Sequence, residues 1–381
     1  MTIVLCGSGS GGHITPLVAV AKAIKEKSPE TRLVFIGEIN GKFNDVIRYS
    51  RLFDEELFIS TGKFRRYHNE PFIRRITDIK TIALNIRDLF KITNGVFQGR
   101  RLIHKLKADA VFLKGGSVCI PAGLGAKFAG VVTVTHDSDA VPGISNRIGG
   151  KHAVYHTTGM PESYYNFASG QTVYVGLPIS KDFRLFNNDE AQNIKLNLGI
   201  AATAPTLLIT GGSQGASRLN NWCAEVLPKL LQDNPELFVI FVTGKNKEVQ
   251  INNPRVRVID FTNEMYNLAA ASDLIIARAG ATTVAEFATM KKALILVPNP
   301  DLAGGHQLKN AKVFKDSESV IIVDEAQIKV NPDLLRASVQ KLIDDQALRF
   351  KLAENLFRTV PERPAAEAIA ELLLAGNRGN V

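Results

Sequence analysis

The feature that most constrains this chain is a strand–glycine loop–helix unit that occurs twice, once in each half. The first unit runs from TIVLCG through GSGSGGHITP into the helical PLVAVAKAIKEK, over residues 2–27. The second begins at residue 206 as TLLITGGSQGAS and continues into another helical run. Apolar strands and helices alternate after each unit, which is typical of parallel sheets covered by helices. The sequence therefore predicts an α/β chain with two doubly wound halves.

The length agrees with this division, because 381 residues are too many for one ordinary core. We expect the boundary within residues 175–183, which gives domains 1–176 and 177–362. Each glycine loop follows the first strand of its half. Two loops at corresponding places favour a binding site shared between the halves.

Composition limits the compartment and the partners. The three cysteines are far apart and form no C-x-x-C pair, which favours reduced thiols without a zinc site in a cytosolic protein. A strand begins at the second residue, so we expect no signal peptide. No uncharged apolar run reaches the ~18 residues of a membrane span. The net charge is +9, and residues 60–107 alone carry this surplus, with twelve Lys/Arg against three acidic residues. Such a segment suggests an anionic partner surface, either lipid headgroups or nucleic acid.

The first glycine loop, residues 7–16, allows three interpretations. It can form a phosphate cradle beside a base, a tight strand-to-helix turn, or a dinucleotide fingerprint. The last interpretation uses the G-x-G-x-x-G spacing of Gly7, Gly9 and Gly12. It would also use Glu38, which ends the second predicted strand where a ribose-binding acid belongs. The loop alone does not choose among these interpretations.

His13 is the candidate base in this loop. We expect Thr15 to be the helix N-cap and Pro16 the first helical residue, so that loop amides and the helix dipole face an anion. His13 would then stand just before the helix, whose positive end lowers the pKa of its imidazole and keeps it able to accept a proton. A histidine hydrogen-bonded to backbone in a structural turn fits the loop equally well.

Two stretches of the second half combine polar side chains with a helix start. Thr283 and Glu286 have the spacing of a capping box, and Glu286 is alternatively a carboxylate that accepts hydrogen bonds from a ribose diol. His306, Gln307 and Asn310 follow another turn. An amide both donates and accepts, which suits sugar hydroxyls, but ordinary helix capping explains the same residues.

The stretch HDSD, residues 136–139, contains a D-x-D pattern. This pattern binds a metal–nucleotide in some glycosyltransferases, and cleft-edge carboxylates without a metal fit it as well. No G-x-x-x-x-G-K-[ST] occurs, which disfavours a P-loop NTPase.

Residues 72–92 predict an amphipathic helix within the basic segment. Its apolar face consists of Phe72, Ile76, Ile79, Ala83, Ile86 and Phe90. We expect this face to pack on its own domain. The charges are instead expected to contact an anionic membrane, and the contact residues are Lys63, Arg65, Arg66, Phe72, Arg74 and Arg75.

These motifs, taken in order, resemble the MurG family of UDP-N-acetylglucosamine transferases over nearly the whole chain. The matching stretches are GSGSGGHITP, GGSQGA, RAGATTVAE and HQLKNA. The resemblance implies a GT-B fold, in which two Rossmann-like domains face an interdomain cleft. It places the donor in the C-terminal half and a lipid acceptor in the N-terminal half, and it implies that a last helix, residues 363–377, crosses back to the first domain.

The resemblance also implies roles for individual residues. Glu286 would hold the donor ribose, Gln307 would contact the sugar hydroxyls, and His13 would be the catalytic base or an acceptor contact. The other donor-binding residues would be Gly11, Gly12, Thr15, Ser213, Gln214, Gly215, Phe261, Thr262, Met265, Ala281, Thr282, Thr283 and His306. The acceptor side would comprise Gly115, Gly116, Asp137, Asp139 and Asn146.

Three positions depart from the family pattern. The chain has GGS at 115–117 where the family often has GGY, HDSD where it often has HEQN, and Ser180 where an arginine is common. These departures concern the acceptor side more than the donor side.

The sequence therefore predicts inverting transfer of N-acetylglucosamine from UDP-GlcNAc to an undecaprenyl-linked muramoyl-peptide acceptor. We expect no cofactor and no metal requirement, although magnesium is compatible with the sequence, and no nucleic acid partner. The enzyme would be cytoplasmic and peripheral on the inner face of the cell membrane. Alternatives are transfer to another lipid such as diacylglycerol, an NAD-dependent oxidoreductase, and a nucleotide-sugar binder without turnover.

Overall fold

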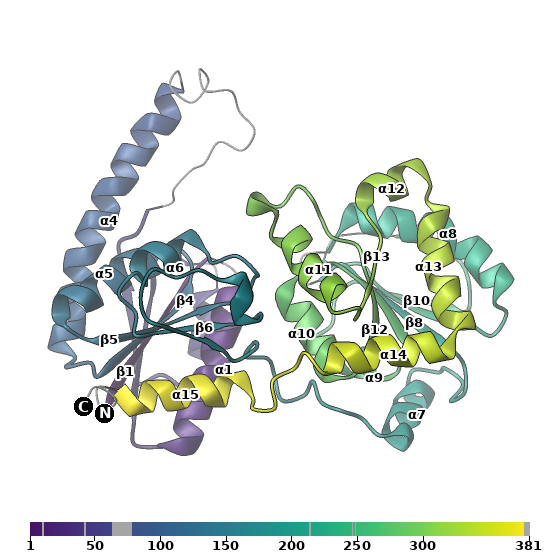
Figure 1. Cartoon of the computed structure of the whole chain (residues 1–381), viewed down its shortest axis with the longest axis horizontal. Coiled ribbons are helices and arrows are strands. Elements are labelled where there is room, and N and C mark those ends of the chain that lie inside the picture. The colour runs from purple at the N-terminus through teal and green to yellow at the C-terminus, as the bar shows by residue number, and fades with distance from the viewer. Residues whose placement is uncertain are drawn as a thin grey trace. The chain divides into compact units, whose positions relative to one another are not determined.

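The structure is a computed structural model that describes residues 1–9, 11–41, 43–62, 78–212, 215–245, 247 and 249–376. The chain divides into two compact units (Figure 1). One comprises Met1–Ile179 with Pro361–Val381, and the other comprises Ser180–Val360.

The first unit has a sheet of seven strands, all paired in parallel, in the order β3-β2-β1-β4-β5-β6-β7. The strands are β1 (Thr2–Gly7), β2 (Arg32–Glu38), β3 (Glu55–Ile59), β4 (Ala110–Gly115), β5 (Val132–Asp137), β6 (Tyr155–Thr158) and β7 (Gln171–Tyr174). The helices are α1 (Gly11–Lys27), α2 (Asn44–Ser50), α4 (Ile79–Lys105), α5 (Cys119–Ala129), α6 (Ile144–Gly149), η1 (Glu162–Tyr164) and α15 (Ala365–Ala375).

Alternating side chains of this sheet build two separate cores. Ile3 and Leu5 of β1 pack with α1, α2 and α15 on one face. Val4 and Cys6 pack with α4 and α5 on the other face. This two-residue period follows from the strand pleat, and it explains why strands buried on both faces read as continuous apolar runs.

The predicted inward face of the 72–92 helix is wrong for the residues that the structure describes. Ile86 and Phe90 are 53% and 72% exposed, whereas Phe72 and Ile76 lie outside the described residues. Another stripe of α4 faces inward, and it comprises Asp88, Ile92, Gly95, Gly99 and Ile103. Its glycines permit close packing, because a Cβ on Gly95 would collide with the backbone oxygen of Ser60. Glycine spacing therefore decided which face is buried, and the larger side chains remain outside.

The second unit has six parallel strands in the order β10-β9-β8-β11-β12-β13. The strands are β8 (Thr206–Thr210), β9 (Phe238–Val242), β10 (Val256–Ile259), β11 (Leu274–Ala277), β12 (Ala293–Leu296) and β13 (Ile321–Ile322). The helices are α7 (Asn188–Asn197), α8 (Ser217–Asp233), α9 (Met265–Ala270), α10 (Ala281–Thr289), η2 (Ala303–Gly305), α11 (His306–Asp316), α12 (Glu325–Val330), α13 (Asp333–Asp344) and α14 (Gln346–Phe357). The prediction of two doubly wound halves is confirmed.

The strand order repeats between the units. In both, the chain moves outward from the first strand to the third and then returns to the other side of the first strand. The reversal leaves a switch point between β1 and β4 in one unit and between β8 and β11 in the other. Ligands of open α/β sheets bind at the carboxyl ends of the strands that flank such a point.

Candidate active site

The predicted donor residues of the second unit that the structure describes follow strands at the carboxyl edge of its sheet. The loop after β8 holds Gly215, β10 leads to Phe261 and Thr262, and α9 begins at Met265. The start of α10 holds Ala281, Thr282, Thr283 and Glu286, and the start of α11 holds His306 and Gln307. Ser213 and Gln214 lie outside the described residues. The parallel topology brings the described residues to one edge, which the sequence spacing alone does not establish.

The described part of the loop between β8 and α8 combines a left-handed glycine with a helix N-terminus. Gly215 has a φ of +67°, and a Cβ there would lie 2.5 Å from the backbone oxygen of Thr243. Helix α8 begins at Ser217, and its N-cap residue Ala216 makes no side-chain cap bond. Lys247, which the sequence analysis missed, donates from Nζ to Ser217 Oγ at 2.7 Å. A helix N-terminus with a cation beside it favours a diphosphate.

Glu286 has no hydrogen-bond or ion-pair partner within the part of the chain that the structure describes. The N-cap of α10 is Gly280, so Thr283 lies inside the helix and the capping-box alternative is wrong. The Glu286 carboxyl makes no hydrogen bond or ion pair with any residue that the structure describes, although it is half-buried. Burial raises its pKa from 4.5 to about 8. A desolvated, unpaired carboxyl at a switch point is typical of a functional group that awaits a ligand.

Gln307 has its amide orientation fixed. Its Oε1 accepts the backbone N–H of Asn299 at 2.8 Å, so the amide nitrogen of the side chain is directed elsewhere. Asn310 is buried and donates from Nδ2 to the Ala279 carbonyl at 3.2 Å, which ties α11 to the start of α10. Because the N-cap of α11 is Gly305, none of the predicted polar residues caps that helix.

Phe261 and its neighbours form an exposed aromatic edge. The Phe261 ring is 38% exposed, and Lys245 Nζ lies 4.3 Å from its centroid. Thr262 Oγ1 accepts the backbone N–H of Glu264 at 2.9 Å, just before α9. An exposed aromatic face beside a cation suits a flat base such as uracil.

In the first unit, α1 begins earlier than the sequence predicts. The helix starts at Gly11, so the expected N-cap at Thr15 is wrong, and Gly12 and His13 lie in the first turn. Pro16 lies inside the helix, where its ring keeps a helical φ and only the bond to the Gly12 carbonyl is lost. Ser10 lies outside the described residues.

His13 is a neutral imidazole with a defined tautomer. Its Nδ1 lies 2.8 Å from the Ser8 carbonyl, which only accepts, so Nδ1 carries the proton and Nε2 does not. Burial, followed by the nearby Lys114 ammonium, lowers the pKa of His13 to about 4. The neutral state is as expected, but its cause differs from the helix-end effect that the sequence suggested. Gly115 has a φ of +128°, and a Cβ there would lie 3.0 Å from His13 Nε2. No side chain fits between β4 and this ring.

Lys114 is a buried cation at this edge that the sequence motifs did not predict. It ends the apolar run AVFLK, and its Nζ donates to Ser138 Oγ at 2.8 Å. Burial lowers its pKa to about 8, while the Asp137 and Asp139 carboxylates act in the opposite direction. A lysine at the end of a strand that is otherwise apolar was the signal that could have identified it.

The predicted acceptor residues Asp137, Asp139 and Asn146 lie around the same edge. Asp137 is buried, and its Oδ1 accepts the backbone N–H of Gly143 at 2.8 Å. Burial raises the pKa of Asp137 to about 6. Asn146 donates from Nδ2 to the His136 carbonyl at 2.9 Å. Among the described residues, no three His, Cys, Asp or Glu side chains are grouped to hold a metal ion.

Glu38, the acid that a dinucleotide interpretation needs, is already engaged. It is buried, and its Oε2 accepts a hydrogen bond from Ser117 Oγ at 2.8 Å. Ser8 Oγ lies 3.3 Å from the same Ser117 hydroxyl. Glu38 therefore fixes the turn after β4, next to Gly116, instead of facing an open ribose site.

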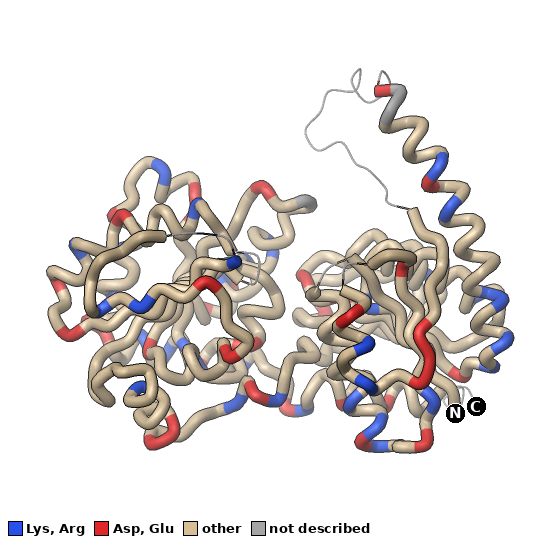
Figure 2. The backbone as a smooth tube through the Cα atoms, turned by 180° about the vertical axis from the view of Figure 1, so that it is seen from behind, with Lys and Arg blue, Asp and Glu red and all other residues tan. Residues whose placement is uncertain are grey.

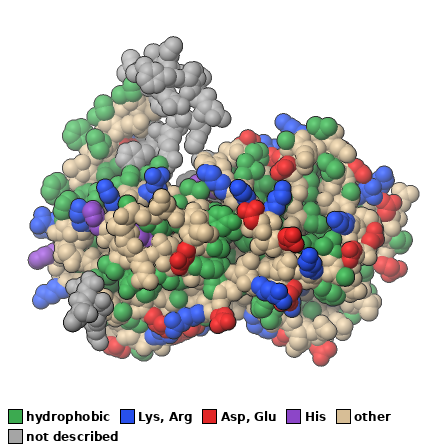
Figure 3. Space-filling view, in the orientation of Figure 1, with side chains coloured by type: hydrophobic (Ala, Val, Ile, Leu, Met, Phe, Trp, Pro, Cys, Tyr) green, Lys and Arg blue, Asp and Glu red, His purple; other side chains and the backbone are tan. Residues whose placement is uncertain are grey.

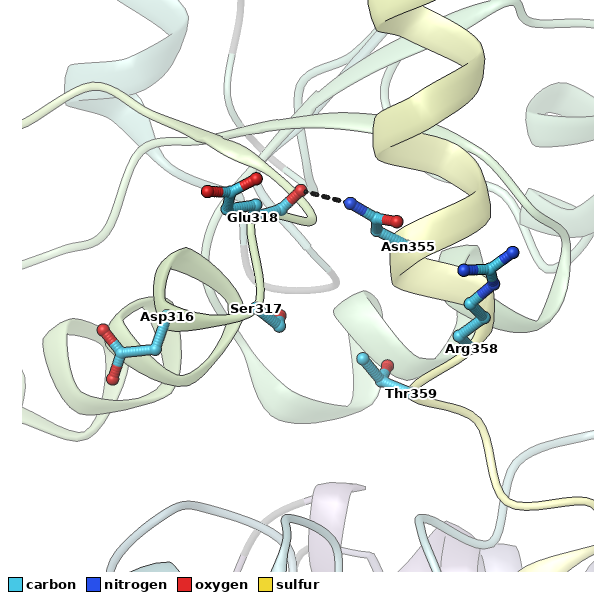
Figure 4. Close-up of a pocket in the computed structure, with 6 residues that line it drawn as sticks. All are labelled: Asp316, Ser317, Glu318, Asn355, Arg358 and Thr359. Carbon is cyan, nitrogen blue, oxygen red and sulfur yellow. Dashed lines mark hydrogen bonds between the residues drawn. The ribbon is translucent and has the colours of Figure 1, made fainter.

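A separate pocket of about 450 Å³ lies elsewhere in the second unit (Figure 4). It lies between the C-terminal ends of α11 and α14, where Asn355 Nδ2 donates to the Glu318 carbonyl at 3.0 Å. Its lining residues are Asp316, Ser317, Glu318, Asn355, Arg358 and Thr359. None of them belongs to the predicted site.

Comparison with known proteins identifies the family. Residues 3–155 match the glycosyltransferase family 28 N-terminal domain, and residues 206–369 match the glycosyltransferase family 28 C-terminal domain. A protein of Lachnospira eligens is 32% identical over 348 residues, which cover 90% of this chain and 91% of that protein. A protein of Acetivibrio thermocellus is 28% identical over 382 residues, which cover 98% and 97%. Both are named UDP-N-acetylglucosamine--N-acetylmuramyl-(pentapeptide) pyrophosphoryl-undecaprenol N-acetylglucosamine transferase.

Solved structures agree on the fold. The MurG of Acinetobacter baumannii has a TM-score of 0.74 at 24% identity and covers 98% of this chain and 99% of its own. The calicheamicin glycosyltransferase CalG4 has a TM-score of 0.69 at 15% identity. The predicted GT-B fold is confirmed, and the oxidoreductase alternative is wrong. The chain belongs to glycosyltransferase family 28 and, within it, to the family of the UDP-N-acetylglucosamine--N-acetylmuramyl-(pentapeptide) pyrophosphoryl-undecaprenol N-acetylglucosamine transferases.

Proposed function

We propose that this enzyme transfers N-acetylglucosamine from UDP-GlcNAc to N-acetylmuramyl-(pentapeptide) pyrophosphoryl-undecaprenol, with inversion at the anomeric carbon. The observation that carries the proposal is the unpaired, half-buried carboxyl of Glu286 at the switch point of the second unit. A nucleoside diphosphate sugar supplies hydrogen-bonding partners for the polar groups at this edge of the sheet. Its ribose diol donates to a carboxylate, and its diphosphate accepts from helix amides.

The donor contacts follow from the geometry of the second unit. The α8 N-terminus and Lys247 would bind the diphosphate, and Phe261 would stack against the uracil. The amide nitrogen of Gln307 would donate to a sugar hydroxyl, because its Oε1 is already held by Asn299. Backbone amides stabilise the charge that develops on the departing diphosphate, so the reaction as proposed needs no cofactor or metal ion.

On the acceptor side, His13 would accept the proton of the attacking hydroxyl at Nε2. Its Nδ1–H bond to Ser8 fixes the ring and the tautomer, and its pKa of about 4 keeps it unprotonated at neutral pH. Lys114 and Asp137 would place opposite charges near the incoming acceptor. General bases of this kind contribute ~10²–10⁴-fold to turnover.

We further propose that α4 brings the enzyme to the inner face of the cell membrane. Hydrophobic side chains lie along the exposed edge of α4 (Figure 3), and the exposed large apolar residues of this helix include Ile82, Ile86, Leu89, Phe90 and Phe97. Lys and Arg recur along the same helix (Figure 2), including Arg87, Lys91, Arg100 and Arg101. Apolar area beside basic residues suits an interfacial contact with anionic lipid.

The remaining predicted contacts, Lys63, Arg65, Arg66, Phe72, Arg74 and Arg75, lie outside the described residues. No helix within the described part of the chain is long and apolar enough to span a membrane.

An acceptor-dependent turnover assay tests the reaction. The enzyme is incubated with UDP-GlcNAc and either the muramyl-pentapeptide pyrophosphoryl lipid or diacylglycerol, and the lipid products are identified by mass spectrometry. We expect the mass of the first acceptor, and not of diacylglycerol, to increase by one N-acetylhexosamine. Transfer to diacylglycerol alone would replace the proposed acceptor, and binding of UDP-GlcNAc without any product would indicate a binder without turnover.

A further inference from the structure

One polar network of the second unit joins two loops that the proposed donor would contact. Its centre is Arg218, in the first turn of α8. From Nη2 it donates to Asn299 Oδ1 at 2.7 Å and pairs with Glu325 Oε2 at 3.0 Å. From Nη1 it pairs with the Asp301 carboxylate. Asn299 and Asp301 belong to the segment between β12 and α11, so Arg218 ties that segment to the helix after the glycine loop.

The network is anchored in the unit interior. Glu325 is buried, and its other oxygen lies 2.5 Å from Nη1 of the buried Arg278. Arg278 also donates to the Val297 carbonyl at 2.9 Å. The sheet order β8-β11-β12 places β11 between the two loops. Arg218 therefore connects the two loops across the end of β11, and the buried pair of Glu325 and Arg278 holds it in place.

The network ends on Gln307. The backbone N–H of Asn299 donates to Gln307 Oε1 at 2.8 Å, while Asn299 Oδ1 also accepts the backbone N–H of Asp301 at 3.0 Å. These bonds hold Asn299 in a single orientation. Gln307 consequently keeps its oxygen inward and its amide nitrogen available. If Asn299 moved, the amide could rotate, and its donor and acceptor would exchange places.

We propose that Arg218 is a positioning residue that fixes residues 299–307 and thereby sets the selectivity of the enzyme for the N-acetylglucosamine moiety of its donor. The inference rests on the proposed function, because it takes Gln307 to contact the sugar. A hydrogen-bonding site discriminates strongly only when its donors and acceptors are held in place. Arg218 is 42% exposed and Asp301 67%, and exposed ion pairs add little to global stability. The pair with Asp301 therefore adds little to folding, and the buried Glu325 keeps Arg278 as a cationic partner when Arg218 is replaced.

Isothermal titration with UDP, UDP-GlcNAc and its C4 epimer UDP-GalNAc tests the proposal. The proteins compared are the parent, Arg218→Met, Arg218→Lys and Arg257→Met. Arg257→Met is the matched control, because it removes an exposed arginine from β10 of the same unit. For Arg218→Met we expect parental UDP affinity, about three- to tenfold weaker UDP-GlcNAc binding and a reduced preference over UDP-GalNAc. Arg218→Lys should be intermediate, because an ammonium cannot span the three partners of the guanidinium. Arg257→Met should behave as the parent.

Two results would overturn the proposal. Equal weakening of UDP and UDP-GlcNAc would mean that Arg218 contacts the diphosphate or supports the fold, and thermal melting would separate these causes. An unchanged preference for UDP-GlcNAc would mean that the network does not control Gln307. A parent protein that fails to prefer UDP-GlcNAc over UDP-GalNAc would instead contradict the proposed donor, independently of the variants.

Discussion

Replacement of Glu286 by glutamine should raise the free energy of unfolding and weaken the binding of UDP. Burial raises the pKa of this carboxyl from 4.5 to about 8. Between these values the folded protein retains a proton that the unfolded chain releases, so the free energy of unfolding falls as the pH rises through this window. One pKa unit corresponds to ~1.4 kcal/mol, so the 2.5 units from pH 4.5 to 7 cost at most about 3.5 kcal/mol. An uncharged amide of the same shape avoids this cost.

The stabilisation should appear as a pH-dependent difference in melting temperature. For a unit of this size, Ser180–Val360, ~1 kcal/mol corresponds to ~2–4 °C, so Glu286→Gln should melt up to roughly 7–14 °C above the parent at pH 7. Well below pH 4.5 the two proteins should melt together, because the carboxyl is then protonated in both the folded and the unfolded states. Glu236→Gln is the matched control, since Glu236 is exposed on the same unit, and it should show no such divergence.

The same carboxyl should determine the affinity for UDP. Glu286→Ala should weaken UDP binding about ten- to a hundredfold, the factor for a hydrogen bond to a charged group. Because the ribose diol requires the ionised carboxylate, the parent should bind UDP more tightly as the pH rises from 6 to 8, by up to about tenfold per unit. Titration in buffers of different ionisation enthalpy should detect the released proton.

Two observations would refute this reasoning. If Glu286→Gln and the parent melted together from pH 5 to 8, the carboxyl would not be desolvated in the folded protein. If Glu286→Ala, correctly folded, bound UDP as tightly as the parent, the ribose contact would be wrong.

Three further outcomes follow from the first unit. His13→Ala should reduce turnover by ~10²–10⁴-fold and preserve UDP affinity; near-parental turnover at saturating substrates would remove His13 as the base. Gly115→Ala should also impair turnover, because its methyl would lie 2.9 Å from the His13 ring and the φ of +128° strains any L residue; an unimpaired variant would mean that the ring position is not required. Ile86→Ser with Phe90→Ser should reduce sedimentation with anionic liposomes, whereas Phe350→Ser, which alters a residue 61% exposed on the second unit, should not; equal sedimentation of both variants would exclude α4 as the contact.

The sequence predicted the architecture because the architecture depends on periodicity. Short apolar runs such as TIVLCG and TLLITG, each followed by glycines, are sufficient to specify a parallel sheet with a loop at its carboxyl edge. The residues at which the helices begin were harder to predict from the sequence. Thr15 and Thr283 have the chemistry of N-caps, yet α1 and α10 begin at Gly11 and Ala281. Local cap preferences are small, and the packing of the strand-to-helix turns outweighs them.

It was harder to predict which side chains are buried than to predict which segments form helices and strands. The apolar period through Ile86 and Phe90 is genuine, but α4 is a long helix with a second stripe that contains Gly95 and Gly99. Periodicity does not show which of two stripes packs inward, because that depends on how closely the neighbouring backbone approaches. Lys114 was missed for a related reason. Its effect on His13 requires two strands that are distant in sequence to lie side by side, as β1 and β4 do.

The return of the chain to the first unit has a consequence for its synthesis. Ile369 and Leu373 of α15 are fully buried against Ile14 and Leu17 of α1. The first helix of the chain therefore cannot complete its packing until the last helix has been synthesised. While residues 180–360 are translated, which takes roughly 10 to 35 s at ~5–20 residues per second, that apolar groove has no native cover. The nascent N-terminal unit therefore exposes this apolar face until α15 has been synthesised, and termination before residue 365 would leave the face uncovered.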